Sequence, residues 1–217
     1  MSREFLLRLL SSILLLPLVF LIIVYGSLYF NLFIILCLFV SCYEWHKMSI
    51  NKTYYIYGII FLFFSFYSAY KLINYNENNI YFLIVILICI STDVGGYLFG
   101  KLIKGPKLIK ISPKKTYAGL LGGYFLSLIS IYYFLSNIII QNNKDFLTVK
   151  FAVLIIIISS VSQIGDIIIS YFKRLSKIKD TGKIIPGHGG LLDRIDGMIF
   201  AIPFSYILLS TNFLNIL

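Results

Sequence analysis

The charged residues of this chain gather in one segment near its C-terminal end, from Ser170 to Asp196. The segment reads SYFKRLSKIKDTGKIIPGHGGLLDRID and lies between long apolar runs. Cationic side chains beside a glycine-rich turn suit phosphate groups, because glycine lets backbone N–H groups approach an oxyanion. Carboxylates in the same segment suit a divalent cation that is held partly by substrate phosphates. The residue types therefore predict a site for a metal ion and phosphate.

The composition identifies the class of protein that carries this segment. The chain has 217 residues, of which 59% are apolar and 13% charged, and its mean hydropathy is +0.90. These values predict an all-α, polytopic integral membrane protein. The formal net charge of +10 comes from basic residues between apolar spans, so we expect anionic lipids and phosphorylated substrates as partners and no nucleic acid. The three cysteines lie in apolar runs without metal-ligand spacing.

About seven transmembrane helices can be drawn, each long enough to cross a bilayer. Their expected ranges are about 5–24, 27–44, 54–73, 80–100, 118–140, 151–173 and 195–213. The first resembles a signal peptide but continues without a cleavage site, so we interpret it as a retained span. No linker or second domain interrupts the chain, and we expect one membrane domain over residues 1–217. Within it, residues 93–123 and 162–196 carry the motifs.

The basic residues also predict an orientation. Of the 19 lysines and arginines, all but Lys71, Lys144 and Lys150 fall on one side of the membrane when the seven spans alternate. This asymmetry places the N-terminus and both motif loops in the cytoplasm and the C-terminus outside. We therefore expect an integral protein of a bacterial-type inner membrane.

A polar stripe follows the sixth expected span. Ser159, Ser162, Asp166, Ser170 and Lys173 are spaced three or four residues apart, which puts them on one helix face. Helix packing would explain the serines, but the charge of Asp166 requires a partner or a cation. Asp193 and Asp196 are three residues apart and share a face if a helix has begun there. They could cap that helix or form a metal cluster with Asp166.

Residues 93–123 form a second constellation. Gly96 and Gly100 make a GxxxG packing motif, and Ser112, Lys114, Lys115 and Thr116 suit phosphate. Alone this basic loop is weak evidence, but it is expected on the same side of the membrane as the first segment. His188 has no second histidine near it, so a phosphate contact or a structural hydrogen bond is favoured over metal ligation. Glu44, Trp45 and His46 are expected to anchor the second span at the interface.

These residues resemble the phosphatidate cytidylyltransferase family, also called CDP-diacylglycerol synthases. The resemblance is carried by the family signature, a second motif and a Gly-Asp pair. The signature residues are Ser170, Lys173, Arg174, Lys179, Asp180, Gly182, His188, Gly189, Gly190, Asp193, Arg194 and Asp196. The second motif comprises Asp93, Gly95, Tyr97, Gly100, Ser112, Pro113, Lys115, Thr116 and Gly119, and the pair is Gly165-Asp166. The chain departs from the family pattern at Ile169, where members often carry Glu, and at Ala118, where an acidic or amide residue is usual.

The resemblance implies transfer of a cytidylyl group from CTP to phosphatidate, giving CDP-diacylglycerol and pyrophosphate. It implies magnesium, with potassium as a further cation, and a homodimer is left open. Asp166, Asp193, Lys173 and Arg174 are the implied catalytic residues, with Asp166, Asp193 and Asp196 as metal ligands. The implied substrate-binding residues are Asp93, Ser112, Lys115, Thr116, Ser170, Lys179, His188, Gly189, Gly190 and Arg194.

Two other functions remain open from the sequence. One is a related CTP-dependent enzyme that acts on another membrane lipid, such as an isoprenoid. The other is an ion or phosphate transporter that uses Asp93 and Asp166 within the membrane, although the charges gather on one side rather than through the bilayer.

Overall fold

The computed structural model describes residues 27–75, 79–109, 112, 115–138, 149–185 and 189–211. Apart from two isolated bridges, the regular structure in these ranges is helical, which confirms the all-α prediction. The helices are α2 (Ser27–Ser49), α3 (Tyr55–Ile73), α4 (Ile80–Leu102), α5 (Tyr117–Ile138), α6 (Val149–Leu175), α7 (Leu192–Ile195) and α8 (Met198–Ser210). Five of them, α2 to α6, are long and apolar enough to cross a membrane. The protein is therefore a polytopic membrane protein.

The first and last of the seven expected spans differ from these five. The expected span at 5–24 lies outside the described residues. The expected span at 195–213 is represented by α8, which has 13 residues and is shorter than a bilayer crossing requires. A short helix, α7, precedes it, and Asp196 and Gly197 between the two keep right-handed helical dihedral angles.

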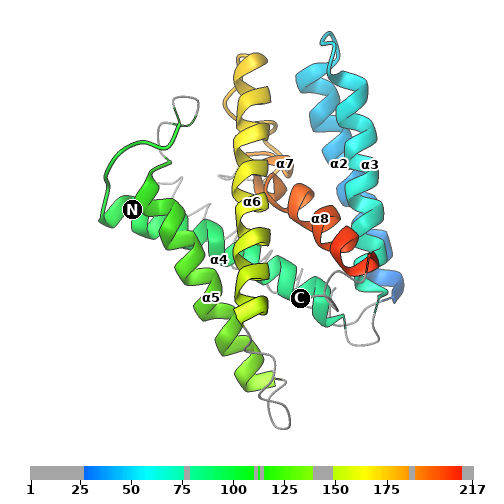
Figure 1. The fold of residues 1–217 in the computed structure, drawn as a ribbon. Coiled ribbons are helices and arrows are strands. Elements are labelled where there is room, and N and C mark those ends of the chain that lie inside the picture. Colours follow the sequence, from blue (N-terminus) through cyan, green and yellow to red (C-terminus); the bar gives the residue numbers. More distant parts are fainter. Residues whose placement is uncertain are drawn as a thin grey trace. The chain divides into compact units, whose positions relative to one another are not determined.

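The described residues divide into two compact units, which we treat separately. The first unit contains the residues up to Asn79 together with Phe172–Asp196, and the second contains Ile80–Tyr171 with the residues from Gly197 onward. Helix α6 contributes to both, because its last turn belongs to the first unit. Figure 1 shows α2 and α3 of the first unit side by side, and α4 and α5 of the second unit packed across one another.

In the first unit, one face of α2 is buried. Phe30, Cys37, Ser41, Glu44, Trp45 and Met48 are all less than 9% exposed and recur at helical spacing. The Trp45 ring lies against Gly58 of α3, where any side chain would collide with it. Its indole Nε1 donates to the carbonyl of Tyr55 at 3.0 Å. We expected Trp45 to anchor the span at the membrane interface. Instead, it packs between helices.

In the second unit, α4 and α5 approach closely through glycines. A Cβ atom on Gly95 would collide with the backbone of Gly122, and one on Gly119 would lie 2.7 Å from the carbonyl oxygen of Gly96. The GxxxG prediction is confirmed, because Gly100 also lies against α5, where an added Cβ atom would be 3.7 Å from the Cα atom of Gly119. This close approach fixes the two helices that flank the loop at 103–116.

Serine side chains join α6 to this pair. Ser159 forms a hydrogen bond of 2.7 Å with Thr92 of α4, and Ser160 forms one of 2.8 Å with Tyr124 of α5. Gly165 lies against Phe200 of α8, whose ring would be 2.6 Å from an added Cβ. The packing interpretation of the serines is thus correct for Ser159, and it leaves Asp166 to be explained.

Gly95→Ala should destabilise the second unit, because the new methyl group meets rigid backbone atoms of α5. We expect a loss of about 1–3 kcal/mol in the free energy of unfolding, as for overpacked cores. Chemical denaturation of detergent-solubilised protein would measure it. Gly96→Ala is the matched control, since its new methyl group would lie an ordinary 3.7 Å from the carbonyl oxygen of Gly119 and alanine favours a helix. Equal stability of the two variants would contradict the proposed close packing at Gly95.

Candidate active site

The signature segment folds around the carboxylate of Asp193. Lys173, in the last turn of α6, donates to Asp193 Oδ1 at 2.8 Å. The backbone N–H groups of Thr181 and Gly190 donate to Oδ2 at 2.7 and 3.0 Å, and the Thr181 hydroxyl lies 3.1 Å from the same oxygen. One carboxylate therefore joins the end of α6, the loop that follows it and the start of α7.

Glu44 provides a second buried carboxylate in the same unit. It is 1% exposed, and its Oε1 accepts the backbone N–H of Leu191 at 2.9 Å. Its Oε2 accepts the N–H of Leu192 at 2.8 Å and the Thr181 hydroxyl at 2.9 Å. The expectation that Glu44 anchors a span at the membrane interface is therefore wrong. One feature of the sequence indicates such a role: Glu44 lies within an apolar run, where a carboxylate needs a partner.

The glycines of the signature make room for these two carboxylates. A Cβ atom on Gly190 would lie 2.6 Å from Glu44 Oε1, and one on Gly182 would lie at the same distance from that oxygen. Gly189 has a φ of +90°, which other residues rarely adopt. It also forms an isolated antiparallel β-bridge with Ile185. These positions need glycine for the fold of the loop itself.

Lys173 contacts two carboxylates of this unit. Its side chain is 10% exposed and lies 3.8 Å from Asp196 Oδ2 in addition to its contact with Asp193. Burial alone would raise the pKa of the Asp193 carboxyl. The ammonium of Lys173 and the surrounding backbone N–H groups outweigh burial and hold the pKa below its usual value. Asp193 is therefore ionised at neutral pH.

The other cations of the segment are turned outward. Arg174, Lys179 and Arg194 are exposed, and Arg174 Nη1 donates to the carbonyl of Ile178 at 3.2 Å. An exposed guanidinium retains several donors in a fork that matches phosphate oxygens. His188 lies outside the described residues, as do Pro186 and Gly187.

In the second unit, Asp166 pairs with Lys115. The ammonium of Lys115 lies 2.5 Å from Asp166 Oδ2 and also points to the Gln163 carbonyl at 3.4 Å. Ser170, one helical turn after Asp166, donates to Oδ1 at 3.3 Å. Both charged side chains remain partly exposed, at 23% and 28%. The pairing brings together residues that the sequence had assigned to separate motifs.

The loop between α4 and α5 brings Lys115 to this position. It folds back on itself through the bridge between Lys107 and Thr116 and a hydrogen bond of 2.8 Å from the Leu108 N–H to the Lys115 carbonyl. The Lys115 N–H binds the carbonyl of Ser112 at 3.0 Å. The hydroxyl of Thr116 accepts the Gly119 N–H at 3.1 Å and so caps α5.

Asp93, the remaining predicted residue of this unit, is exposed on α4.

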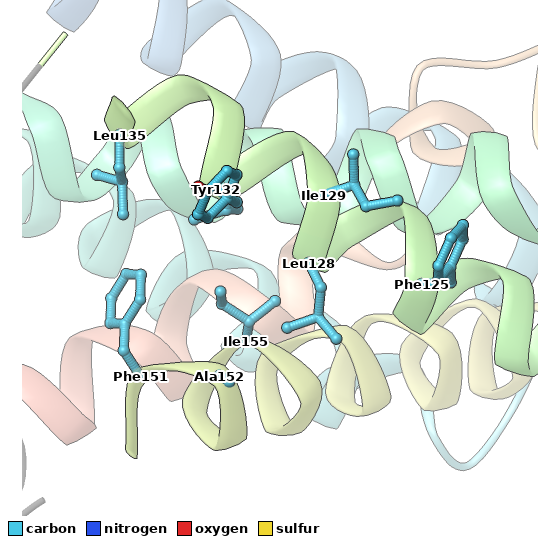
Figure 2. A pocket seen from close by; sticks show the side chains of 9 residues that line it. Phe125, Leu128, Ile129, Tyr132, Leu135, Phe151, Ala152 and Ile155 are labelled. Atoms are coloured by element: carbon cyan, nitrogen blue, oxygen red, sulfur yellow. The ribbon is translucent and has the colours of Figure 1, made fainter. Parts of the chain in front are cut away.

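An apolar groove lies between α5 and α6 (Figure 2). Its volume is about 360 Å³. Figure 2 shows it lined by Phe125, Leu128, Ile129, Tyr132 and Leu135 of α5 and by Phe151, Ala152 and Ile155 of α6. Ile155 precedes Asp166 by eleven residues on one helix, a separation of about 16 Å along its axis. The unit thus carries an apolar recess and a charged pair on the same helix.

Known proteins are similar to this chain in sequence. The sequence model of the family described as "Cytidylyltransferase family" matches residues 50–212. A phosphatidate cytidylyltransferase of Rickettsia felis is 36% identical over 203 residues, which cover 91% of this chain and 88% of that protein. The chain belongs to the cytidylyltransferase family. A Staphylococcus aureus protein of the same name is 43% identical over 133 residues, covering 59% of this chain and 48% of its own length.

The cytidylyltransferase match contains Asp166, Asp193 and all their described partners, but it begins after Glu44. Glu44 nevertheless binds the signature loop directly. A cytidylyltransferase must bring polyanionic substrates together, so its reaction needs positive charge near the reacting phosphates.

The carboxylates differ in how well they suit the magnesium that this family resemblance implies. A carboxylate oxygen accepts about two hydrogen bonds. Each oxygen of Asp166 is contacted by one donor among the described residues, Lys115 at Oδ2 and Ser170 at Oδ1, so each retains room for a cation. In Asp193, Oδ2 already has three donors, which leaves Oδ1 only. Among the described residues, no group of three or more His, Cys, Asp or Glu side chains is arranged to bind a metal. Asp166 belongs to the second unit, and Asp193 and Asp196 belong to the first. The binding of one cation by all three therefore stays a prediction.

Proposed function

We propose that this chain transfers a cytidylyl group from CTP to phosphatidate and so forms CDP-diacylglycerol and pyrophosphate. The observation that carries the proposal is the signature from Ser170 to Asp196, which is complete in sequence and folds around the single carboxylate of Asp193. The name of the relatives, which are 34–36% identical over most of this chain, supports phosphatidate as the acceptor.

The proposed reaction needs no nucleophile from the protein. An oxygen of the phosphatidate phosphate attacks the α-phosphorus of CTP, a new P–O bond forms, and the bond to the β-phosphate breaks. Pyrophosphate leaves with the electron pair of that bond. The barrier lies in bringing two polyanions into line, so catalysis consists of positioning and charge neutralisation.

We assign different parts of this positioning and charge neutralisation to different described residues. The exposed side chains of Arg174 and Lys179 are suited to bind substrate phosphates, with Arg174 able to bind two oxygens at once. Lys173 is buried against Asp193, so we assign it to holding that carboxylate rather than to first contact with substrate. Lys115, partly exposed beside Asp166, can move from the carboxylate to a phosphate oxygen.

We include magnesium in the proposal, with Asp166 as the residue whose oxygens have room for it. When bound, the cation would polarise the α-phosphate and stabilise the leaving oxygens. Asp193 and Asp196 stay predicted ligands of the same kind. We also propose that the signature faces the cytoplasm, where CTP is available, and that the groove between α5 and α6 receives an acyl chain from the bilayer.

The test is CTP-dependent formation of CDP-diacylglycerol by the purified protein. With CTP labelled at the α-phosphate, the label should move into a lipid product when phosphatidate and magnesium are present, and chelation should abolish it. Label in lipid only with another acceptor would reassign the substrate. Label in no lipid, from folded protein and across the acceptors tried, would overturn the proposal.

A further inference from the structure

We propose that Glu44 is a positioning residue for the reaction, acting through the loop that holds Asp193. The idea rests on the proposed function for its kinetic readout. No substrate contact is assigned to Glu44, which is 1% exposed. Its effect on turnover would pass through the residues that it binds, namely Thr181, Leu191 and Leu192.

The hydrogen bonds of Glu44 connect distant parts of the chain. It lies on α2, and its three partners are 137 to 148 residues further along. Each partner is close to Asp193 in the loop: the Thr181 N–H donates to Asp193 Oδ2, Leu191 follows the donor Gly190, and Leu192 directly precedes Asp193. A shift of this turn would therefore move the donors around Asp193.

The Thr181 hydroxyl makes the connection direct. It lies 2.9 Å from Glu44 Oε2 and 3.1 Å from Asp193 Oδ2. A hydroxyl has one proton, so it can donate fully to only one of the two carboxylates at a time. Glu44 and Asp193 thus share a donor, and a change in either carboxylate alters the hydrogen bond that the other receives.

The packing around Glu44 leaves its side chain little freedom. Cβ atoms on Gly182 and Gly190 would each lie 2.6 Å from its Oε1. Two glycines of the signature therefore enclose this carboxylate and limit where it can move. A glutamine in its place has the same shape but presents an NH₂ group to one set of backbone N–H donors, and two donors cannot pair.

The test compares Glu44→Gln with Ser49→Ala in purified, full-length protein. Ser49 lies on the same helix, is fully buried and donates to the Trp45 carbonyl at 2.6 Å, and it makes no hydrogen bond with the described residues of the signature loop. For Glu44→Gln we expect kcat per folded molecule to fall about 10- to 100-fold, as when a supporting partner of an active-site group is lost. The KM for CTP should change less than about threefold, because the exposed cations of the loop are untouched.

Two further variants separate positioning from general stability. Glu44→Asp keeps the carboxylate and should recover part of kcat. Thr181→Val removes the shared hydroxyl, and its effect on kcat should not add to that of Glu44→Gln, since both break one connection. Ser49→Ala should leave kcat and KM per folded molecule unchanged. A kcat within twofold of wild type in Glu44→Gln, or a purely additive double variant, would overturn the proposal.

Hydrogen–deuterium exchange gives a readout that does not depend on the reaction. Glu44→Gln should speed exchange of the amides in 180–193 at least tenfold while the α4–α5 helices exchange as in the wild type. If wild-type protein makes no CDP-lipid but this exchange result holds, the proposed function fails and the positioning role of Glu44 in the loop stands. Unchanged exchange in 180–193 would refute it.

Discussion

Asp166→Asn should leave the protein folded and lower kcat for CDP-lipid formation by about 100- to 1,000-fold, the loss typical of one essential electrostatic group. Its carboxylate is partly exposed and its ion pair with Lys115 is partly hydrated. Such pairs contribute only about 0–1 kcal/mol to stability, so the free energy of unfolding should hardly change. Turnover of α-labelled CTP and thermal unfolding in detergent would measure both quantities.

Lys115→Gln is the comparison that isolates the carboxylate. If Asp166 serves only to hold Lys115, the two variants should lose equal activity. A larger loss in Asp166→Asn assigns the carboxylate a role of its own, such as holding the cation. An Asp166→Asn enzyme that keeps more than a third of wild-type turnover would remove this residue from the catalytic machinery.

Asp193→Asn should abolish turnover as well, but with a loss of stability of about 3–5 kcal/mol, the typical result of breaking a buried ion pair. Asp193 accepts donors at both oxygens, and the amide of asparagine must turn its NH₂ toward one set of them. The side chains of Asp193 and Lys173 are only 6% and 10% exposed, so water cannot replace the lost interactions. Denaturant unfolding of the purified variant would measure the change.

The pH dependence of the stability difference between wild type and Asp193→Asn is the control for this prediction. The pKa of Asp193 is lower in the folded protein than in the unfolded chain, because the donors around it outweigh the effect of burial. Its contribution to stability is therefore full above about pH 4, the usual pKa of an unfolded aspartate, and is lost as the pH falls through the folded value. The stability gap between wild type and Asp193→Asn should shrink at pH 3. A gap that stays constant from pH 7 to pH 3 would show that ionisation of Asp193 is not its source.

The sequence predicted those features that depend on local pattern. Apolar length predicted α2 to α6 to within a few residues at most ends, and serine spacing predicted the polar face of α6. The glycine pattern of α4 predicted close helix packing, although the tightest approach is at Gly95 rather than within the Gly96–Gly100 pair. Each of these depends on residues that lie within one helix.

The sequence could not predict contacts that join distant segments. The bonds from Glu44 to Thr181 and Leu192 depend on how helix α2 meets a loop over 130 residues later. Which cation pairs with which carboxylate is decided in the same way, so the sequence predicted Lys115 as a phosphate-binding residue but not its ion pair with Asp166. The burial of Lys173 beside Asp193 likewise could not be inferred from its place in the signature.

The long separation between Glu44 and its donors affects how the chain is made. When the ribosome has completed α2, the loop that binds Glu44 does not yet exist. Thr181 follows 137 residues later, which at about 5–20 residues per second takes roughly 7–30 seconds. During that interval the nascent chain carries a carboxylate whose final partners have not been synthesised. A chain interrupted before Thr181 cannot form this site, because the donors that bind Glu44 come only with the signature.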